Sequence, residues 1–134
     1  MKDIKLTDYP FHHKTQTRWK DLDAFQHINN AVFLSYFEDA RVALFDRWNL
    51  QPNGKSLIVA KIVANYYKQL LHPSNFIIGQ KISRLGTTSF DIQSTLFNNN
   101  NEPVSDAIIT CVCFDFDNQV TQPVYELIKK DYEG

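Results

Sequence analysis

The sequence predicts an α+β fold in which one long helix is wrapped by a curved antiparallel sheet of five strands. Apolar residues recur at steps of three and four between Val32 and Trp48, which is the spacing of a helix. Four segments with the composition of strands follow this helix, and only short turns separate them. Strands joined in this way form antiparallel sheets. One helix can cover such a sheet only if the sheet curls around it, so we expect strong curvature.

The composition is that of one folded domain covering residues 1–134. Hydrophobic residues make up 43% of the chain, which is enough for one core and argues against disorder. The 14 basic and 15 acidic residues give a formal net charge of -1, which argues against binding to nucleic acid or an anionic membrane. No apolar run reaches the roughly 18 residues of a membrane span, and the N-terminus lacks a signal-peptide pattern. We therefore expect a cytoplasmic protein.

The first expected elements are a short strand over residues 15–19 and the long helix. The helix is expected to begin at Asn29 or Asn30 and to end near Trp48. Asparagine is a favoured N-cap because its side-chain oxygen accepts a free backbone N–H. Apolar residues lie on more than one side of this helix, as expected of a helix enclosed by a sheet. The signals that end it are Asn49, Pro52, Asn53 and Gly54.

The second half of the chain predicts four strands and a short helix. Residues 57–70 are rich in β-branched and aromatic side chains but are too many for an ordinary strand. We therefore expect this strand to be strongly curved or bulged. The remaining expected elements are strands over residues 76–85, 89–97 and 103–116, and a terminal helix over residues 124–132.

Cys111 and Cys113 lie two residues apart in the last expected strand. This spacing puts both side chains on one face of the strand, as core packing requires. Same-face neighbours are poorly placed for a disulfide, and no second cysteine pair exists for a zinc site. Unpaired core cysteines fit a reducing compartment.

The polar loop before the helix holds the groups best suited to chemistry. It carries the carboxylates of Asp21 and Asp23 and the imidazole of His27. The dipole of the helix keeps a nearby carboxylate ionised. The free N–H groups of its first turn can donate to an oxygen that gains negative charge in a transition state. This combination suits hydrolysis of an activated acyl group.

Each of these residues also fits a purely structural role. The two carboxylates can serve as solvated or capping groups at the end of a strand, and His27 as a hydrogen-bonded support. Asn29 and Asn30 can be helix caps. The chain has no glycine-rich phosphate loop, no serine-hydrolase elbow and no metalloprotease motif. The loop is therefore the candidate site. The spacing of its residues alone does not decide between a catalytic and a structural role.

The stretch RWKDLDAFQHINNAVFLSYFEDAR, residues 18–41, resembles the signature of hot-dog-fold acyl-CoA thioesterases of the 4-hydroxybenzoyl-CoA thioesterase type. In that family a D-x-D strand end leads through an H-x-N-N loop into a helix. Residues 58–90 resemble the second block of the family, with a curved strand, a turn and an S-F hairpin in order. The resemblance covers about residues 15–116 and implies the hot-dog fold, a sheet wrapped around a central helix.

The resemblance implies roles for individual residues. Asp23 is implied as the catalytic carboxylate, acting as nucleophile or general base. An N–H near Asn30 is implied to polarise the thioester oxygen. His27, counted with the catalytic residues, and Asn29, counted with the substrate-binding residues, match the motif and are implied either to shape the loop or to orient water and thioester. Asp21 also matches and is implied to be structural. The residues implied to hold the nucleotide phosphates of the substrate are Thr87, Thr88, Ser89 and Arg84, with Lys81 nearby.

The implied function is hydrolysis of an acyl-CoA to a free acid and CoA, with no metal or redox cofactor. The implied partner is a second copy of the chain, in a homodimer with the site between subunits or in a homotetramer. Phe25 favours CoA as the carrier, whereas Gln26 is shared with acyl-carrier-protein thioesterases, so acyl carrier protein is the alternative. A non-catalytic acyl-CoA or acyl-carrier binding protein is another. The candidates for an apolar acyl pocket, which fit the core equally well, are Phe25, Phe33, Phe37 and Tyr66.

Overall fold

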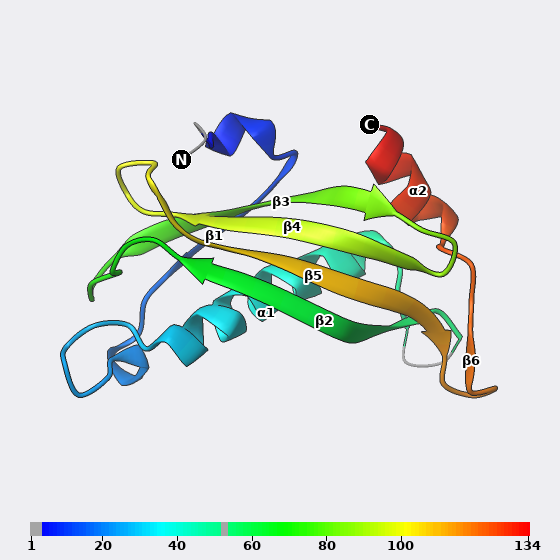
Figure 1. Cartoon of the computed structure of the whole chain (residues 1–134), viewed down its shortest axis with the longest axis horizontal. Helices are drawn as coiled ribbons and strands as arrows, with labels where there is room; N and C mark the ends of the chain where they lie inside the picture. The colour runs from blue at the N-terminus through cyan, green and yellow to red at the C-terminus, as the bar shows by residue number, and fades with distance from the viewer. Residues whose placement is uncertain (1–3, 52–53) are drawn as a thin grey trace.

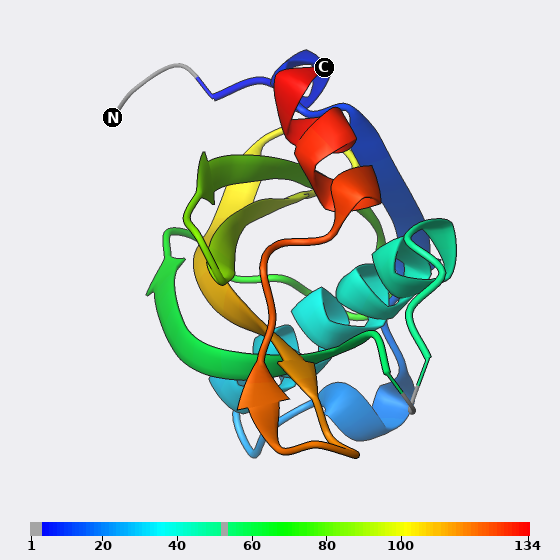
Figure 2. The same ribbon diagram turned by 90° about the vertical axis from the view of Figure 1, so that its right-hand side faces the viewer.

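The long helix α1 (Asn30–Arg47) lies along the inside of a curved antiparallel sheet, which confirms the predicted α+β arrangement (Figure 1 and Figure 2). The structure is a computed structural model that describes residues 4–51 and 54–134. Its strands lie in the order β1-β3-β4-β5-β2, and a two-residue strand β6, which the sequence did not predict, pairs with β5. The other elements are β1 (Phe11–Gln16), β2 (Ser56–Tyr66), β3 (Asn75–Leu85), β4 (Ser89–Phe97), β5 (Pro103–Asp115), β6 (Val120–Thr121) and α2 (Glu126–Glu133).

Helix α1 has the bounds that its sequence predicts. Asn29 is the N-cap, and its side-chain oxygen accepts the N–H of Ala31 at 2.9 Å. Two of its apolar residues, Leu34 and Val42, are 37% and 49% exposed, so the sheet does not enclose every apolar side of the helix. Pro52 and Asn53, predicted in the turn after it, lie outside the described residues. The side chains that α1 buries are Phe33, Tyr36, Phe37, Ala40, Arg41 and Leu44.

The first strand lies earlier than the sequence predicted. It spans Phe11–Gln16, and the expected residues 17–19 leave it. The reason is that Thr17 already binds the turn before β3, through its N–H to the carbonyl of Ser74 at 2.9 Å. The chain then forms a 3-10 turn over Trp19–Asp21. The prediction of a strand as far as residue 19 was therefore wrong.

Strand β2 is bulged as predicted but shorter than expected. The register with β5 shifts between Val59 and Lys61. The strand ends at Tyr66 and not at residue 70, because the N–H groups of Tyr67 and Lys68 both donate to the carbonyl of Val104, at 2.8 and 3.2 Å. The two donors on one acceptor break the regular ladder.

Strand β2 also forms a free edge of the sheet, since its only partner strand in the described chain is β5. Ile58 and Val63 lie on its convex face, and Val59 and Ile62 on its concave face, as their β5 partners show. All four are between 37% and 47% exposed. A strand that is apolar on both faces has the pattern of a strand buried inside a larger sheet.

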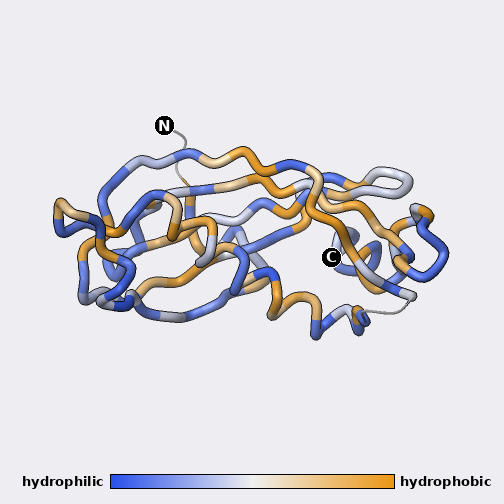
Figure 3. Tube along the Cα trace, turned by 90° about the horizontal axis from the view of Figure 1, so that it is seen from below, coloured by the Kyte–Doolittle hydropathy of each residue, from blue (hydrophilic) through white to orange (hydrophobic). Residues whose placement is uncertain are grey.

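The core lies between the concave face of the sheet and α1. Cys111 and Cys113 are buried there and unpaired, which confirms the prediction of core packing. Burial raises the pKa of the Cys111 thiol to about 12. Hydrophobic and hydrophilic stretches alternate along the chain trace (Figure 3). None of the helices in the described chain is long and apolar enough to cross a membrane.

Candidate active site

Asp23 lies in the tight loop that joins the 3-10 turn to α1. Its Oδ1 accepts the N–H of Phe25 at 2.8 Å and that of His27 at 3.3 Å. A main-chain bond from the Asp23 N–H to the His27 carbonyl, 2.8 Å long, closes the loop, and Gln26 takes a left-handed φ of 67° at its tip. Both hydrogen bonds that the described chain gives this carboxylate use Oδ1. Oδ2 is therefore available to a ligand or a water.

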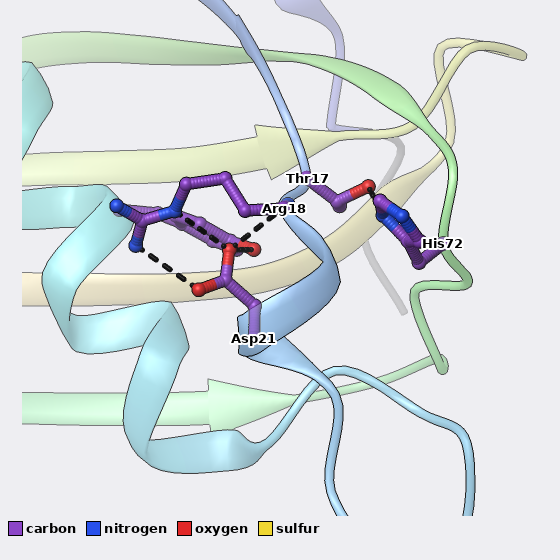
Figure 4. Close-up of polar contacts among 5 residues, drawn as sticks. Thr17, Arg18, Asp21 and His72 are labelled. Atoms are coloured by element: carbon purple, nitrogen blue, oxygen red, sulfur yellow. Dashed lines mark hydrogen bonds and ion pairs between the residues drawn. The ribbon is translucent and has the colours of Figure 1, made fainter.

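Asp21, two residues earlier, is 2% exposed and fully engaged within the protein (Figure 4). Its Oδ2 accepts the Tyr36 hydroxyl at 2.6 Å and the Arg18 main-chain N–H at 3.1 Å. The Arg18 guanidinium donates to both carboxylate oxygens, at 3.1 and 3.0 Å. Burial alone raises the pKa of Asp21, but the bonds from Arg18 and Tyr36 outweigh it and hold the pKa below its usual value. This geometry agrees with a structural role for Asp21.

A cavity of about 450 Å³ opens beside Asp23 and brings three predicted catalytic residues together. It lies within the volume range of ligand sites, roughly 300–1,000 Å³. Its walls combine the polar loop, the start of α1 and the segment that follows β2. The residues that line it are Asp23, Phe25, His27, Ile28, Asn30, Phe33, Lys68 and Gln69.

Asn30, the first residue of α1, lines this cavity. The side-chain oxygen of Asn29 accepts the N–H of Ala31, and Asn29 is not among the residues that line the cavity. The N–H of Asn30, one position earlier than Ala31, has no acceptor in the described chain. A first-turn N–H of this kind is suited to an oxygen that becomes negatively charged.

His27 is held more firmly by its backbone than by its ring. Its main-chain N–H and carbonyl both bind Asp23. Its ring atom Nδ1 is buried and has no hydrogen-bond partner in the described chain. The next residue, Ile28, donates its N–H to the carbonyl of Leu70 at 3.1 Å, so the loop is fastened to the segment after β2.

The predicted phosphate-binding residues lie at the other end of the molecule. Strand β3 starts beside the Asp23 end of the molecule, at the turn bound by Thr17, and its 11 residues run away from it, over roughly 33 Å. The hairpin with Thr87, Thr88 and Ser89 follows that far end (Figure 1). The structure therefore does not bring these residues to Asp23.

Arg84 at this hairpin already has partners inside the protein. Its Nε and Nη2 donate to the two oxygens of Asp91 at 2.9 and 3.1 Å, and Nη2 also donates to the Ser89 hydroxyl at 3.0 Å. The hydrogen bond from Arg84 holds the pKa of Asp91 below its usual value. A phosphate at Arg84 would have to share the guanidinium with this carboxylate.

Lys68 and Gln69 are the cavity residues that sequence reasoning missed. They were expected inside a strand, where neither looked functional. The hydrogen bond between Ile28 and Leu70 holds them beside the site. These two residues are far apart in the sequence, and no local pattern predicts that they are in contact. Among residues 4–51 and 54–134, no group of three or more His, Cys, Asp and Glu side chains is placed to hold a metal ion.

Comparison with known sequences gives a family match over most of the chain. A model of the Thioesterase-like superfamily matches residues 17–130. The long-chain acyl-CoA thioesterase FadM of Escherichia coli K12 is 28% identical over 115 residues, which cover 78% of this chain and 83% of that protein. Protein YsmA of Bacillus subtilis 168 is 28% identical over 99 residues, covering 72% of this chain and 67% of that protein.

Comparison with solved structures gives the same fold. A thioesterase of Thermus thermophilus, solved in complex with coenzyme A and zinc, superposes with a TM-score of 0.81 at 27% identity and covers 94% of this chain and 99% of its own. A thioesterase-superfamily structure from Jannaschia sp. CCS1 gives a TM-score of 0.85 at 19% identity, covering 92% and 81%. These matches confirm the predicted hot-dog arrangement.

Proposed function

This chain belongs to the Thioesterase-like superfamily, and from that premise we propose that it hydrolyses acyl-CoA thioesters at the Asp23 cavity. One observation carries the proposal: Asp23, whose carboxylate has a free oxygen, and Asn30, whose helix-start N–H has no acceptor in the described chain, line the same cavity. The CoA-bound relative and the name of FadM support CoA as the carrier. Unpaired Cys111 and Cys113 support the reducing conditions of the cytoplasm.

In the proposed reaction, Asp23 Oδ2 acts on the thioester carbonyl in one of two ways. As a general base it takes a proton from water while the water oxygen attacks the carbonyl carbon. As a nucleophile it forms an acyl anhydride, which water then hydrolyses. In both routes the carbonyl oxygen gains negative charge against the Asn30 N–H, and the CoA sulfur leaves with the electron pair of the broken C–S bond. The two backbone N–H groups on Oδ1 fix the direction of the carboxylate.

We propose that the active form is a dimer joined along β2. The free edge of this strand carries unpaired backbone groups, which favour pairing with another strand. Its apolar residues on both faces become buried when a second sheet continues the first. Leu34 and Val42 of α1 remain exposed in the single subunit, which supports the same conclusion.

Asp23→Asn tests the function with the smallest change in shape. The amide oxygen still accepts the N–H groups of Phe25 and His27, but it is neither a base nor a nucleophile. Thiol release from acyl-CoA should fall about 10²–10⁴-fold. Asp39→Asn is the matched control, because Asp39 is an exposed carboxylate on α1. Near-normal turnover by Asp23→Asn would refute the proposal, and binding of acyl-CoA by the wild type without any thiol release would favour a binding protein.

A further inference from the structure

The segment after β2 forms one wall of the candidate active-site cavity, to which it contributes Lys68 and Gln69. This segment is fixed on both sides of Gln69. The N–H of Lys68 donates to the carbonyl of Val104 at 3.2 Å, and the carbonyl of Leu70 accepts the N–H of Ile28 at 3.1 Å. Ile28 belongs to the polar loop before α1, so the two bonds set the position of the Gln69 main chain relative to that loop.

Lys68 and Gln69 both have side chains that can donate hydrogen bonds, but only that of Lys68 does so within the protein. The Lys68 amine donates to the carboxylate of Glu102, and Glu102 is held in turn by the side-chain N–H of Asn98 at 3.1 Å. Gln69 is exposed, and its carboxamide has no hydrogen-bond partner in the described chain. A substrate can therefore bind the Gln69 carboxamide without breaking a bond inside the protein.

Hydrolysis of a thioester puts negative charge on the carbonyl oxygen. Enzymes stabilise such an oxygen with preorganised donors, among them backbone N–H groups and the side chains of asparagine and glutamine. A carbonyl oxygen has two lone pairs and accepts more than one donor. The N–H of Asn30 is one donor of the proposed reaction, and it belongs to the same side of the cavity as Asp23 and His27. Gln69 comes from the other wall.

We propose that Gln69 is a further catalytic residue, whose Nε2 donates a hydrogen bond to the thioester oxygen beside the N–H of Asn30. This inference rests on the proposed function. The bond strengthens as the oxygen becomes negative, so it lowers the barrier more than it improves the binding of the substrate. Gln69 neither gains nor loses a proton. Its bond lasts until the CoA sulfur leaves with the electron pair of the broken C–S bond.

Gln69→Met tests the donor, because methionine has a similar length and cannot donate. We expect kcat for lauroyl-CoA to fall at least ~10-fold, since an oxyanion donor is lost, while KM changes little. Gln16→Met is the matched control, because Gln16 is an exposed glutamine of β1 outside this cavity. A raised KM at an unchanged kcat would mean that Gln69 binds an unreacting part of CoA, which would overturn the inference.

Gln69→Glu separates a donor from an acceptor at the same position. The glutamate carboxylate still accepts hydrogen bonds but donates none, and its charge repels the oxygen that becomes negative. We therefore expect kcat to fall further than in Gln69→Met. If Gln69→Glu instead kept the activity of the wild type, the carboxamide oxygen would be the working group, as a holder of the attacking water, and the assignment of Nε2 would be wrong.

Infrared spectroscopy detects the proposed bond directly. Lauroyl-CoA labelled with ¹³C at its carbonyl is bound to the inactive Asp23→Asn variant, with and without Gln69→Met. A donor on the carbonyl oxygen lowers its stretching frequency, so the band should move to higher frequency in the double variant. Equal frequencies would overturn the inference and leave the proposed function standing, whereas a wild type that releases thiol from neither lauroyl-CoA nor butyryl-CoA would refute the function itself.

Discussion

Asp21 and Asp23 are two residues apart in the chain, yet their carboxylates differ in burial and in hydrogen bonding. Asp21 is buried, and both of its oxygens accept hydrogen bonds from Arg18 or Tyr36. Asp23 lies at a cavity, and the described chain binds only its Oδ1, through two backbone N–H groups. A carboxylate with all its acceptor sites filled stabilises a fold, whereas one with a fixed direction and a free oxygen can act on a substrate.

The two roles depend on each other through the main chain. The carbonyl of Asp21 accepts the N–H of Asn29 at 3.1 Å, and Asn29 caps α1. The buried carboxylate therefore helps to fix the point where the helix begins. That point sets the position of the Asn30 N–H, and Asn30 lines the cavity. We expect damage at Asp21 to appear first as lost stability and damage at Asp23 as lost chemistry.

The largest effect on stability is expected from Asp21→Ala. It removes the acceptor for Tyr36 and Arg18 and leaves the buried Tyr36 hydroxyl without a partner. Hydrogen bonds to charged groups contribute roughly 1.5–3 kcal/mol each, and Arg18 is half exposed, so we expect a loss of about 3 kcal/mol in the free energy of unfolding. Urea denaturation followed by circular dichroism measures it.

Asp23→Asn is the natural comparison for this variant, because it should leave the urea midpoint almost unchanged. Asp39→Ala controls for the loss of a carboxylate at an exposed position. If Asp21→Ala proved as stable as Asp39→Ala, the hydrogen bonds around Asp21 would contribute nothing to the stability of the fold. The structural role assigned to Asp21 would then be wrong.

Acidification should lower the free energy of unfolding, because it protonates the Asp21 carboxylate. The folded state holds the pKa of this carboxyl below its ordinary value of 3.8. A group with a lowered folded pKa stabilises fully above the unfolded pKa, and this contribution disappears as the pH falls through the folded pKa. The difference in unfolding free energy between wild type and Asp21→Asn should therefore be constant from about pH 5 to 7 and shrink below about pH 4. A difference that grew on acidification would contradict the assigned bonds.

The features that local chemistry determines were predictable from sequence. The bounds of α1 follow from the cap at Asn29 and from apolar spacing, and both are encoded within a few residues. The bulge in β2 follows from a strand composition too long to stay regular. The Asp23 loop could be identified because its polar residues directly precede the helix, and the family resemblance then separated Asp23 from Asp21.

The features that depend on distant contacts were not predictable in the same way. Strand β1 was placed too late because its pairing with β3 decides where it stops, and Gln16, its last residue, pairs with Asn75, 59 positions later in the chain. Lys68 and Gln69 reach the cavity through a bond between Ile28 and Leu70. The partner of Asp21 is Tyr36, a helix residue whose apolar neighbours made it look like core alone. Each of these depends on the fold as a whole.

The smallest effect is expected from Tyr36→Phe, which tests the contact between the helix and the Asp21 network. The ring keeps its packing against Phe76, with centroids 4.7 Å apart, and only the 2.6 Å bond from the hydroxyl to Asp21 is lost. Asp21 retains Arg18 and no buried donor is orphaned, so we expect a loss of about 1–1.5 kcal/mol in unfolding free energy. The double variant with Asp21→Ala should lose less than the sum of the two single losses, because both remove the same bond. Additive losses would mean that the Tyr36 hydroxyl stabilises the fold through a contact other than Asp21 and that Asp21 is held by Arg18 alone.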